Sequence, residues 1–191
     1  MPSARTGEDK RVRLFVGVEL PDAARGDLAT SIEVLRTSVP VGRWTPAANW
    51  HATVKFLGWV RPSILPMVRE AAEWIARSEP RFTTRLTALG TFPPGRRRSR
   101  VLWAGMDDEG GGFARLSAAL NAALTPVIEP EGRAFTPHVT LARFDPPIAL
   151  PAELPPLVSE PFEVAHLVLF RSHLRGRAPI YEQIASFPLG V

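Results

Sequence analysis

Apolar and polar residues follow two different periods along this chain, and each period predicts a different kind of element. Alternation at every second residue predicts strands, and it is found at Arg11–Leu20, His51–Leu57, Phe82–Leu89, Val101–Met106, His138–Ala142, Phe162–Phe170 and Tyr181–Phe187. Apolar residues three and four positions apart predict helices, at Asp22–Ser38, Ser63–Arg77 and Phe113–Leu124. Because several neighbouring strands are joined by loops too short for a crossover, we expect antiparallel pairing and an α+β fold.

Turn-forming residues divide the chain into many short elements. The 20 prolines among 191 residues are about twice the usual share of about 5%. Loops are predicted at Trp44–Trp50 and Phe92–Arg100, and a proline-rich connector at Pro146–Pro161. Residues 1–10 are polar and predict a flexible tail, so that residues 11–191 would form a single domain.

Composition narrows the class of protein. Cysteine is absent, which excludes disulfides, a thiol nucleophile and cysteine-ligated metals. No apolar run reaches the ~18 residues of a membrane span, and the polar N-terminus lacks the apolar stretch of a secretion signal. We therefore expect a soluble, cytoplasmic protein that needs no membrane partner, and nothing in the sequence demands more than a monomer.

The basic residues are almost all arginines. Of the 23 Lys and Arg residues, only Lys10 and Lys55 are lysines, and the net charge is +4. The planar guanidinium of arginine matches phosphate geometry and stacks on bases, which favours a phosphate-rich partner such as RNA. Genomic base composition also shifts lysine to arginine without any functional meaning, so both interpretations stand at this point.

Two segments that are 87 positions apart share one pattern. His51-Ala52-Thr53-Val54 and His138-Val139-Thr140-Leu141 both read His-x-Thr-aliphatic. In a strand, residues i and i+2 point to the same side, so each segment places an imidazole and a hydroxyl on one face and anchors the other face in a core. Two such strands could present their His-Thr pairs across a single groove.

This set of side chains suits chemistry at phosphorus. Two imidazoles can share acid–base work near neutral pH, while hydroxyls and cations hold a phosphate and stabilise its developing charge. A cationic residue trails each motif, Lys55 in one copy and Arg143 in the other. Strict alternation directs Lys55 to the face of His51 but Arg143 away from His138, so Arg143 needs a bulge or the end of the strand to reach the groove.

The two motifs are also compatible with a structural role, a metal site or a purely binding role. A histidine in a half-buried strand is often a hydrogen-bonded structural residue, and threonine is a good strand former. A metallohydrolase would use His51 and His138 as ligands, but neither strand offers a second ligand at metal-binding spacing, so we expect no metal and no cofactor. A non-catalytic module that binds RNA ends is the third alternative.

The sequence resembles the two-histidine phosphoesterases, and among them the RNA 2′,3′-cyclic phosphodiesterases, also called 2′-5′ RNA ligases. The blocks that carry the resemblance are RLFVGVELP, WTPAANWHATVKFLG, LGTFPP, VLWAG, FTPHVTLAR, LFRSHL and YEQIASFPL, which together span about Arg13–Leu189. The resemblance implies a bilobal fold, with two antiparallel sheets and flanking helices around a central cleft. Each lobe would contribute one His-x-Thr strand.

The resemblance also implies a reaction and a role for each matching residue. The reaction is hydrolysis of a terminal 2′,3′-cyclic phosphate of RNA to a 2′-phosphate without a metal. His51 resembles the acid that protonates the leaving oxygen, and His138 the base that activates water. Thr53 and Thr140 match phosphate-holding hydroxyls, and Arg143 matches an arginine near the phosphate. Transfer RNA fragments, small cyclic nucleotides and 2′-5′ strand joining are alternatives on the same scaffold.

Further candidates lie outside the two motifs. The predicted loop carries Arg96, Arg97, Arg98 and Arg100, which could contact RNA phosphates or simply form a solvated turn. Trp44 could stack on a base, although its sequence context favours a place in the core. We assign Trp103 to the core, and His166 and His173, which lack a threonine partner, to structural or surface positions.

Overall fold

The computed structural model describes residues 11–95, 97–130, 132, 135–174 and 179–190, so the predicted tail, residues 1–10, lies outside the described residues. The helices are α1 (Asp22–Ser38), α2 (Leu65–Ser78) and α3 (Gly112–Leu124), with short 3₁₀ segments at Ala47–Asn49 and Pro62–Ile64. The strands are β1 (Val12–Glu19), β2 (Arg43–Trp44), β3 (His51–Val60), β4 (Phe82–Thr84), β5 (Leu86–Phe92), β6 (Ser99–Met106), β7 (His138–Ile148), β8 (Phe162–Val164), β9 (His166–His173) and β10 (Ile180–Pro188). The expected α+β class is confirmed.

Eight of these strands form one antiparallel sheet that consists of two halves. The β3 half has the order β10-β9-β1-β3, and the β7 half has the order β7-β6-β5 with β2 also paired to β7. A single registered pair, Ala52 with Val139, joins β3 to β7. The two separate sheets expected from the sequence are therefore two halves of one sheet, and the second sheet of the molecule is the small pair β4-β8.

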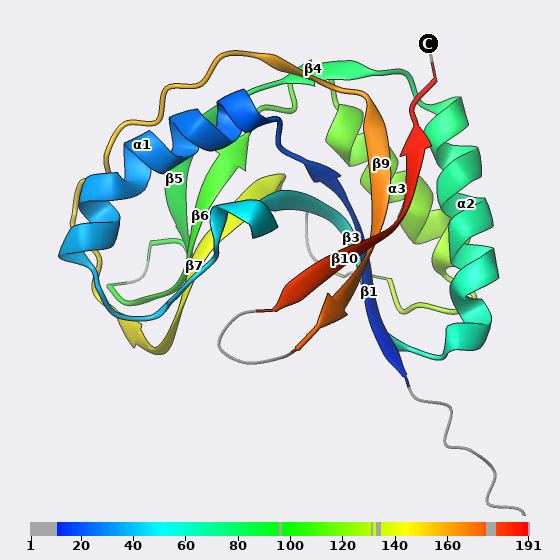
Figure 1. Cartoon of the computed structure of the whole chain (residues 1–191), viewed down its shortest axis with the longest axis horizontal. Coiled ribbons are helices and arrows are strands. Elements are labelled where there is room, and N and C mark those ends of the chain that lie inside the picture. Colours follow the sequence, from blue (N-terminus) through cyan, green and yellow to red (C-terminus); the bar gives the residue numbers. More distant parts are fainter. Residues whose placement is uncertain (1–10, 96, 131, 133–134, 175–178, 191) are drawn as a thin grey trace, which may run out of the picture.

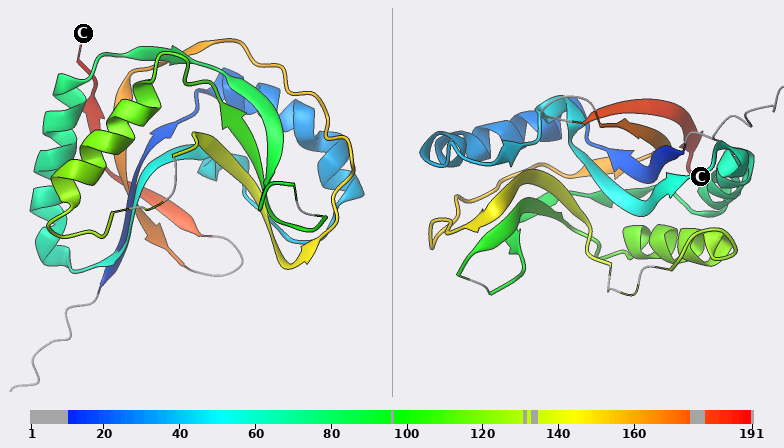
Figure 2. Two further views of the ribbon diagram at one scale, coloured as in Figure 1. Left: turned by 180° about the vertical axis from the view of Figure 1, so that it is seen from behind. Right: turned by 90° about the horizontal axis from the view of Figure 1, so that it is seen from below.

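The helices cover the outer sides of the two halves (Figures 1 and 2). Helix α2 contacts α3, β9 and β10, and α3 contacts β3, so both helices belong to the β3 half. Helix α1 lies over the β7 half in both figures. Each helix buries one apolar stripe at helical spacing, such as Leu28, Ile32 and Leu35 in α1, and these stripes with the sheet residues form one main core.

Several element boundaries differ from those that the alternation predicts. Strand β3 continues past Gly58, where the strand was expected to stop, because glycine adopts the positive φ of 72° that this irregular position requires. Strand β7 runs to Ile148 and takes Pro146 and Pro147 from the expected connector. These prolines have no N–H to donate, and the pairing with β6 accordingly skips from Arg143 to Ile148.

Two predicted strands are each split into two. The segment Phe82–Leu89 divides at Arg85 into β4 and β5, and Phe162–Phe170 divides at Ala165 into β8 and β9. In both cases the first piece leaves the large sheet, because β4 and β8 pair with one another instead. Alternation identifies extended chain but not its pairing partner, so the sequence could not show this division. In the described part of the chain, no helix is long and apolar enough to cross a membrane.

Candidate active site

His51 begins β3 and lies among aromatic side chains of the β3 half. Its ring stacks on Phe15 with ring centroids 4.5 Å apart, and the ring of Tyr181 meets it edge-on at 5.0 Å. The Nδ1 atom is 2.8 Å from the carbonyl oxygen of Asn49, and Nε2 is 3.0 Å from the hydroxyl of Thr53. A carbonyl oxygen can only accept a hydrogen bond, so Nδ1 donates to it and Nε2 is the ring nitrogen that exchanges protons with the site.

His138 occupies the equivalent position at the start of β7. Its Nδ1 is 2.7 Å from the carbonyl oxygen of Thr136, which again is the residue two positions before the histidine. Phe92 and Trp103 flank its ring, with centroids 5.3 and 6.0 Å away. Both imidazoles are therefore oriented by a backbone carbonyl at Nδ1 and supported by rings from neighbouring strands. Trp103 is half-buried on this side of the sheet, so its assignment to the core holds only in part.

The two motifs meet at the junction between the halves. Ala52 and Val139, the middle residues of the motifs, are the paired residues of β3 and β7, and both are fully buried. In an antiparallel pair this register places the flanking residues of one motif opposite those of the other, His51 across from Thr140 and Thr53 across from His138. The sheet thus brings together all four polar residues of the motifs on its open face.

Each strand has a bulge directly after its motif. Val54 is the additional residue where β3 pairs with β1, and Leu141 is the additional residue where β7 pairs with β6. Both strands consequently bury two consecutive residues before the next accessible one. In β7 that accessible residue is Arg143. The bulge turns it to the side of His138, and a bulge is what the sequence required if Arg143 was to reach the groove.

The same bulge makes the expectation for Lys55 wrong. Lys55 is only 2% exposed and lies on the core side of β3, where its Nζ donates a 2.5 Å hydrogen bond to Oδ1 of Asn121 and a 3.4 Å bond to the carbonyl of Glu129. It lines none of the cavities beside the histidines. The lysine therefore fastens α3 to β3, and it cannot hold a phosphate in the groove.

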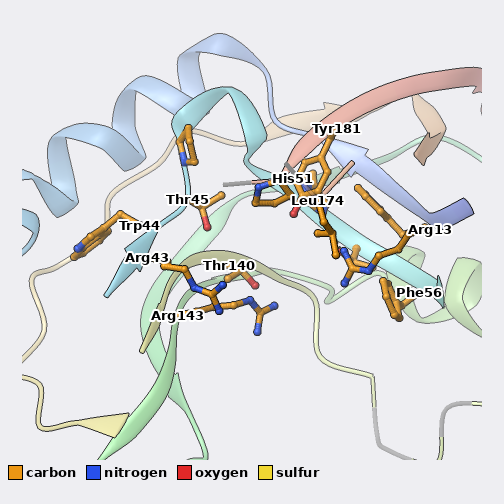
Figure 3. Close-up of a pocket in the computed structure, with 14 residues that line it drawn as sticks. Arg13, Arg43, Trp44, Thr45, His51, Phe56, Thr140, Arg143, Leu174 and Tyr181 are labelled. Carbon is orange, nitrogen blue, oxygen red and sulfur yellow. The ribbon is translucent and has the colours of Figure 1, made fainter. Parts of the chain in front are cut away.

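Two cavities adjoin the paired motifs. The first, of about 500 Å³, is lined by His51, Thr53 and Thr140, and the second, of about 690 Å³, by His138 and Thr136. Thr53, Phe56 and Arg143 line both cavities, so the two cavities are adjacent, and together they are called the groove below. Figure 3 shows the first of them with His51 and Thr140 on opposite sides.

Three arginines from three different strands enter the first cavity. Arg43 of β2 is paired with Arg143 of β7, and Arg13 of β1 comes from the opposite wall (Figure 3). Arg13 is held in place by a 2.9 Å hydrogen bond to Ser172 and by the ring of Phe56, 4.7 Å from its guanidinium carbon. Three guanidinium groups around one cavity provide the charge and the hydrogen-bond donors that suit a phosphate.

Several of these cavity residues carried no signal of their own in the sequence. Arg43 lies outside the matched family blocks, and Arg13 begins one of them without any role being evident, so only the sheet brings both to the histidines. Phe15 and Tyr181 stood within matched family blocks, but nothing in the sequence showed that their rings enclose His51. A partial signal was present in β1, because Arg13 and Phe15 are two residues apart and therefore share a face.

The environment of His51 favours its neutral form. The pKa of His51 is lowered from 6.5 to about 4, chiefly by burial among the rings; the hydrogen bond to Asn49 opposes this change, while His138 and Arg25 add electrostatic repulsion of the charged form. His51 is therefore neutral at pH 7 when the site holds no substrate. Burial also raises the pKa of Tyr181, although Arg13 and Arg143 lower it, so its phenol stays protonated at the cavity wall.

The remaining candidates lie around the rim of the groove. Arg100 lines the second cavity and is 3.7 Å from Asp145, Arg98 donates to the carbonyl of Pro147, and Arg97 is exposed. Arg96 lies outside the described residues. Trp44 lines the first cavity while its indole N–H donates to the carbonyl of Val39, and RNA contact by the arginine loop or by Trp44 stays a prediction.

The described residues contain no group of three or more His, Cys, Asp or Glu side chains arranged to hold a metal ion. His166 is exposed, and His173 is 2.7 Å from a carboxylate oxygen of Glu182. Both histidines lie away from the two cavities, in agreement with their structural or surface assignment.

Comparison with known proteins places the chain in a family. The family model of the 2′-5′ RNA ligase superfamily matches residues 21–176. The chain belongs to this superfamily of two-histidine phosphoesterases. An RNA 2′,3′-cyclic phosphodiesterase from Thermus thermophilus is 32% identical over 93% of this chain and 90% of its own length. One from Geobacillus stearothermophilus is 31% identical over 94% of this chain, which spans only 58% of that relative.

A solved structure agrees with the family assignment. The crystal structure of E. coli LigT complexed with 3′-AMP superposes with a TM-score of 0.76 at 27% identity, and the match covers 95% of this chain and all of that one. The antiparallel sheet with its small second sheet is therefore the fold of this family.

Proposed function

We propose that this protein is an RNA 2′,3′-cyclic phosphodiesterase that opens a terminal cyclic phosphate to a 2′-phosphomonoester. The observation that carries the proposal is the pairing of Ala52 with Val139, which brings two imidazoles and two hydroxyls into one arginine-lined groove. The curated relatives with this name and the nucleotide complex of LigT support the substrate class.

Two proton transfers complete the reaction. In the direction that the family implies, Nε2 of His138 takes a proton from water while the water oxygen forms a bond to phosphorus. The bond from phosphorus to the 3′ oxygen breaks, and Nε2 of His51 gives its proton to that oxygen. The product carries a 2′-phosphate and a 3′-hydroxyl. At the end of the reaction His138 has gained a proton from water and His51 has given one to the 3′ oxygen, and exchange with solvent restores both imidazoles.

The groove supplies the electrostatic part of catalysis. Charge accumulates on the non-bridging oxygens when phosphorus becomes five-coordinate, and hydrogen-bond donors that are already in place stabilise this charge. Arg13, Arg43 and Arg143 converge on the cavity, and Thr53 and Thr140 add a hydroxyl from each half. No metal ion is required in this proposal, because the guanidinium groups provide the positive charge.

The acid role of His51 needs a bound substrate. Its pKa of about 4 leaves little imidazolium at pH 7 in the site without substrate. A phosphate anion next to Nε2 favours the charged form and raises this pKa. His51 thus becomes a competent acid only when a phosphate occupies the groove.

The test replaces each histidine. His51→Ala and His138→Ala should each lower turnover of an oligonucleotide with a 2′,3′-cyclic end by about 100-fold or more, while binding of a 2′-phosphate oligonucleotide persists. His166→Ala is the matched control because His166 is exposed and lies outside both cavities. Chromatography and phosphorus NMR identify the product.

Three results would contradict the proposal. A 3′-phosphate product would require a different geometry of cleavage. Loss of turnover with a chelator, restored by a divalent metal, would favour a metallohydrolase. Binding of RNA ends without any turnover by the unmutated protein would favour a non-catalytic module.

A further inference from the structure

A third cavity adjoins the groove at the far end of β3. It has a volume of about 460 Å³ and is lined by residues from the end of β3 and from the segment after α3, among them Phe56, Trp59 and Arg61. Phe56 also lines both cavities beside the histidines. The third cavity therefore meets the groove at Phe56 and extends it toward the end of β3.

Exposed aromatic rings and arginines share this continuation. Trp59 is 53% exposed and Phe56 is 42% exposed, so both rings are accessible to a ligand. Trp59 is paired with Arg13 across β1 and β3, and paired residues of an antiparallel sheet project to the same side. Arg13 in turn lies over the ring of Phe56, so the two rings and this arginine occupy one face.

The charge of this surface matches a polyanion. Arg11 and Arg61 line the third cavity, and Arg13 lines the first cavity and lies over the ring of Phe56, which lines both. Glu129 contributes a carboxylate to the same lining, so the balance of charge stays positive. Within the described part of the chain, the side chains of Trp59 and Arg61 have no hydrogen bond, ion pair or ring contact.

The chemistry of the substrate requires a path for the rest of the strand. A cyclic 2′,3′-phosphate is the 3′ end of an RNA, so every other nucleotide is attached on the 5′ side of the terminal ribose. Trp59 follows His51 by eight residues of β3, a distance on the order of 26 Å in an extended strand. Stacked nucleotides rise about 3.4 Å each, so fewer than about eight of them reach from the histidines to Trp59.

We propose that the surface formed by Phe56, Trp59, Arg11 and Arg61 binds the single-stranded RNA upstream of the cyclic phosphate. Bases stack on the exposed rings, and the arginines contact the intervening phosphates without reading the sequence. This inference rests on the proposed function, because it extends the same site to the remainder of its substrate. The enzyme accordingly prefers an oligonucleotide end to a cyclic mononucleotide.

The arginine loop between β5 and β6 offers the alternative path for the RNA upstream of the cyclic phosphate. Arg100 is already beside Asp145, and Arg98 donates to the carbonyl of Pro147. Among the described residues, Arg11 and Arg61 have no such partner, and the β3 surface combines them with two exposed rings, which is the combination that binds single strands. The observations therefore favour the path along β3.

The experiment compares kcat/KM for a cyclic mononucleotide with kcat/KM for oligonucleotides of 2, 4, 8 and 12 nucleotides that end in a 2′,3′-cyclic phosphate. We expect kcat/KM of the unmutated protein to rise with length up to about eight nucleotides. Trp59→Ala should lower it about 10-fold for the 12-mer, as expected from the loss of one base stack. The same variant should leave kcat/KM for the mononucleotide within about twofold, as should Arg61→Ala, because neither side chain reaches the histidines.

Trp74→Ala is the matched control. Trp74 is 67% exposed on α2 and lines none of the described cavities, so its loss should leave kcat/KM unchanged for both the mononucleotide and the oligonucleotides. Thermal unfolding of each variant verifies that the fold is intact.

The alternative outcomes separate the two proposals. Turnover that does not depend on length, an equal loss on all substrates with Trp59→Ala, or a length-dependent loss that arises only with Arg97→Ala and Arg98→Ala would overturn the path along β3 and leave the proposed function intact. Failure of the unmutated protein to hydrolyse either the mononucleotide or any oligonucleotide would overturn both.

Discussion

At the scale of single residues, the most informative feature is the burial of one imidazole of the site among aromatic rings. His51 is enclosed by Phe15 and Tyr181, and this burial gives it a pKa of about 4. An exposed histidine in the same motif would be partly protonated at neutral pH and would repel the arginines around it. The rings therefore keep the site free of one positive charge until an anion arrives.

This lowered pKa predicts a loss of stability in mild acid. The pKa of His51 is about 6.5 in the unfolded chain and about 4 in the folded protein, so the unfolded chain binds more protons between these values. The free energy of unfolding should therefore decrease as the pH falls from about 6.5 to about 4. Replacing His51 with glutamine removes this contribution, and urea unfolding at several pH values measures the difference between the two proteins.

Other groups also titrate in this pH range, so the difference in the free energy of unfolding between the unmutated protein and His51→Gln is more informative than the pH dependence of either protein alone. The unmutated protein should lose up to about 3 kcal/mol more than His51→Gln between pH 7 and pH 4, the upper limit for a pKa that falls from 6.5 to about 4 on folding. Parallel curves for the two proteins would mean that burial does not lower the pKa of His51.

At the scale of elements, the bulge decides what each strand presents to the groove. One additional residue after each His-x-Thr motif shifts the alternation, so that Lys55 enters the core while Arg143 enters the cavity. The two strands share this irregularity as well as the motif itself. In regular strands without the additional residue, Lys55 would face the groove and Arg143 would face the core.

A pair of substitutions tests this exchange. Lys55→Met should lower the free energy of unfolding by about 1–3 kcal/mol, because Asn121 loses its charged donor inside the protein, while turnover of a cyclic mononucleotide changes little. Arg143→Met should lower kcat/KM by about 10-fold or more and leave stability nearly unchanged, because Arg143 is exposed in the groove. Denaturant unfolding and steady-state kinetics measure the two effects.

The reverse result would be equally clear. If Lys55→Met abolished turnover in a protein of normal stability, the lysine would act in the groove as the alternation predicted. Stability lost with Arg143→Met would assign the structural role to the arginine instead.

The sequence predicted correctly that the histidine and the threonine of each motif share a face and that the two motifs meet. Alternation placed His51 and Thr53 on one face, and this needs no knowledge of distant contacts. It misplaced Lys55 because the acceptor that draws this side chain inward belongs to α3, 66 residues away in the chain. It missed Arg13 and Arg43 for the same reason, because only the pairing of β1 with β3 and of β2 with β7 brings these side chains to the cavity.

At the scale of the whole molecule, the chain passes repeatedly between the two halves. Helix α1 follows β1 of the β3 half but covers the β7 half (Figure 1). Helix α3 lies between β6 and β7 in sequence but packs on β3 and α2. Neither half is therefore a continuous segment that could fold by itself.

This interlacing predicts one cooperative unfolding transition. Tryptophans report on both halves, Trp50 and Trp74 in the β3 half and Trp44 and Trp103 in the β7 half. Denaturant curves followed by tryptophan fluorescence and by far-ultraviolet circular dichroism should coincide. Fluorescence of variants that retain the tryptophans of one half only should give the same midpoint. Two midpoints that differ between the halves would mean that the lobes unfold as separate domains.

The contact between Ala52 and Val139 has a mechanical consequence. It is the only registered pair between β3 and β7 in the described part of the chain, so it acts as the fulcrum for any rocking of one half against the other. Points next to a fulcrum travel least, and the histidines and threonines flank it directly. The outer walls of the groove could move apart to admit a bulky RNA strand and close again, while the distance between the two imidazoles stays nearly constant during this movement.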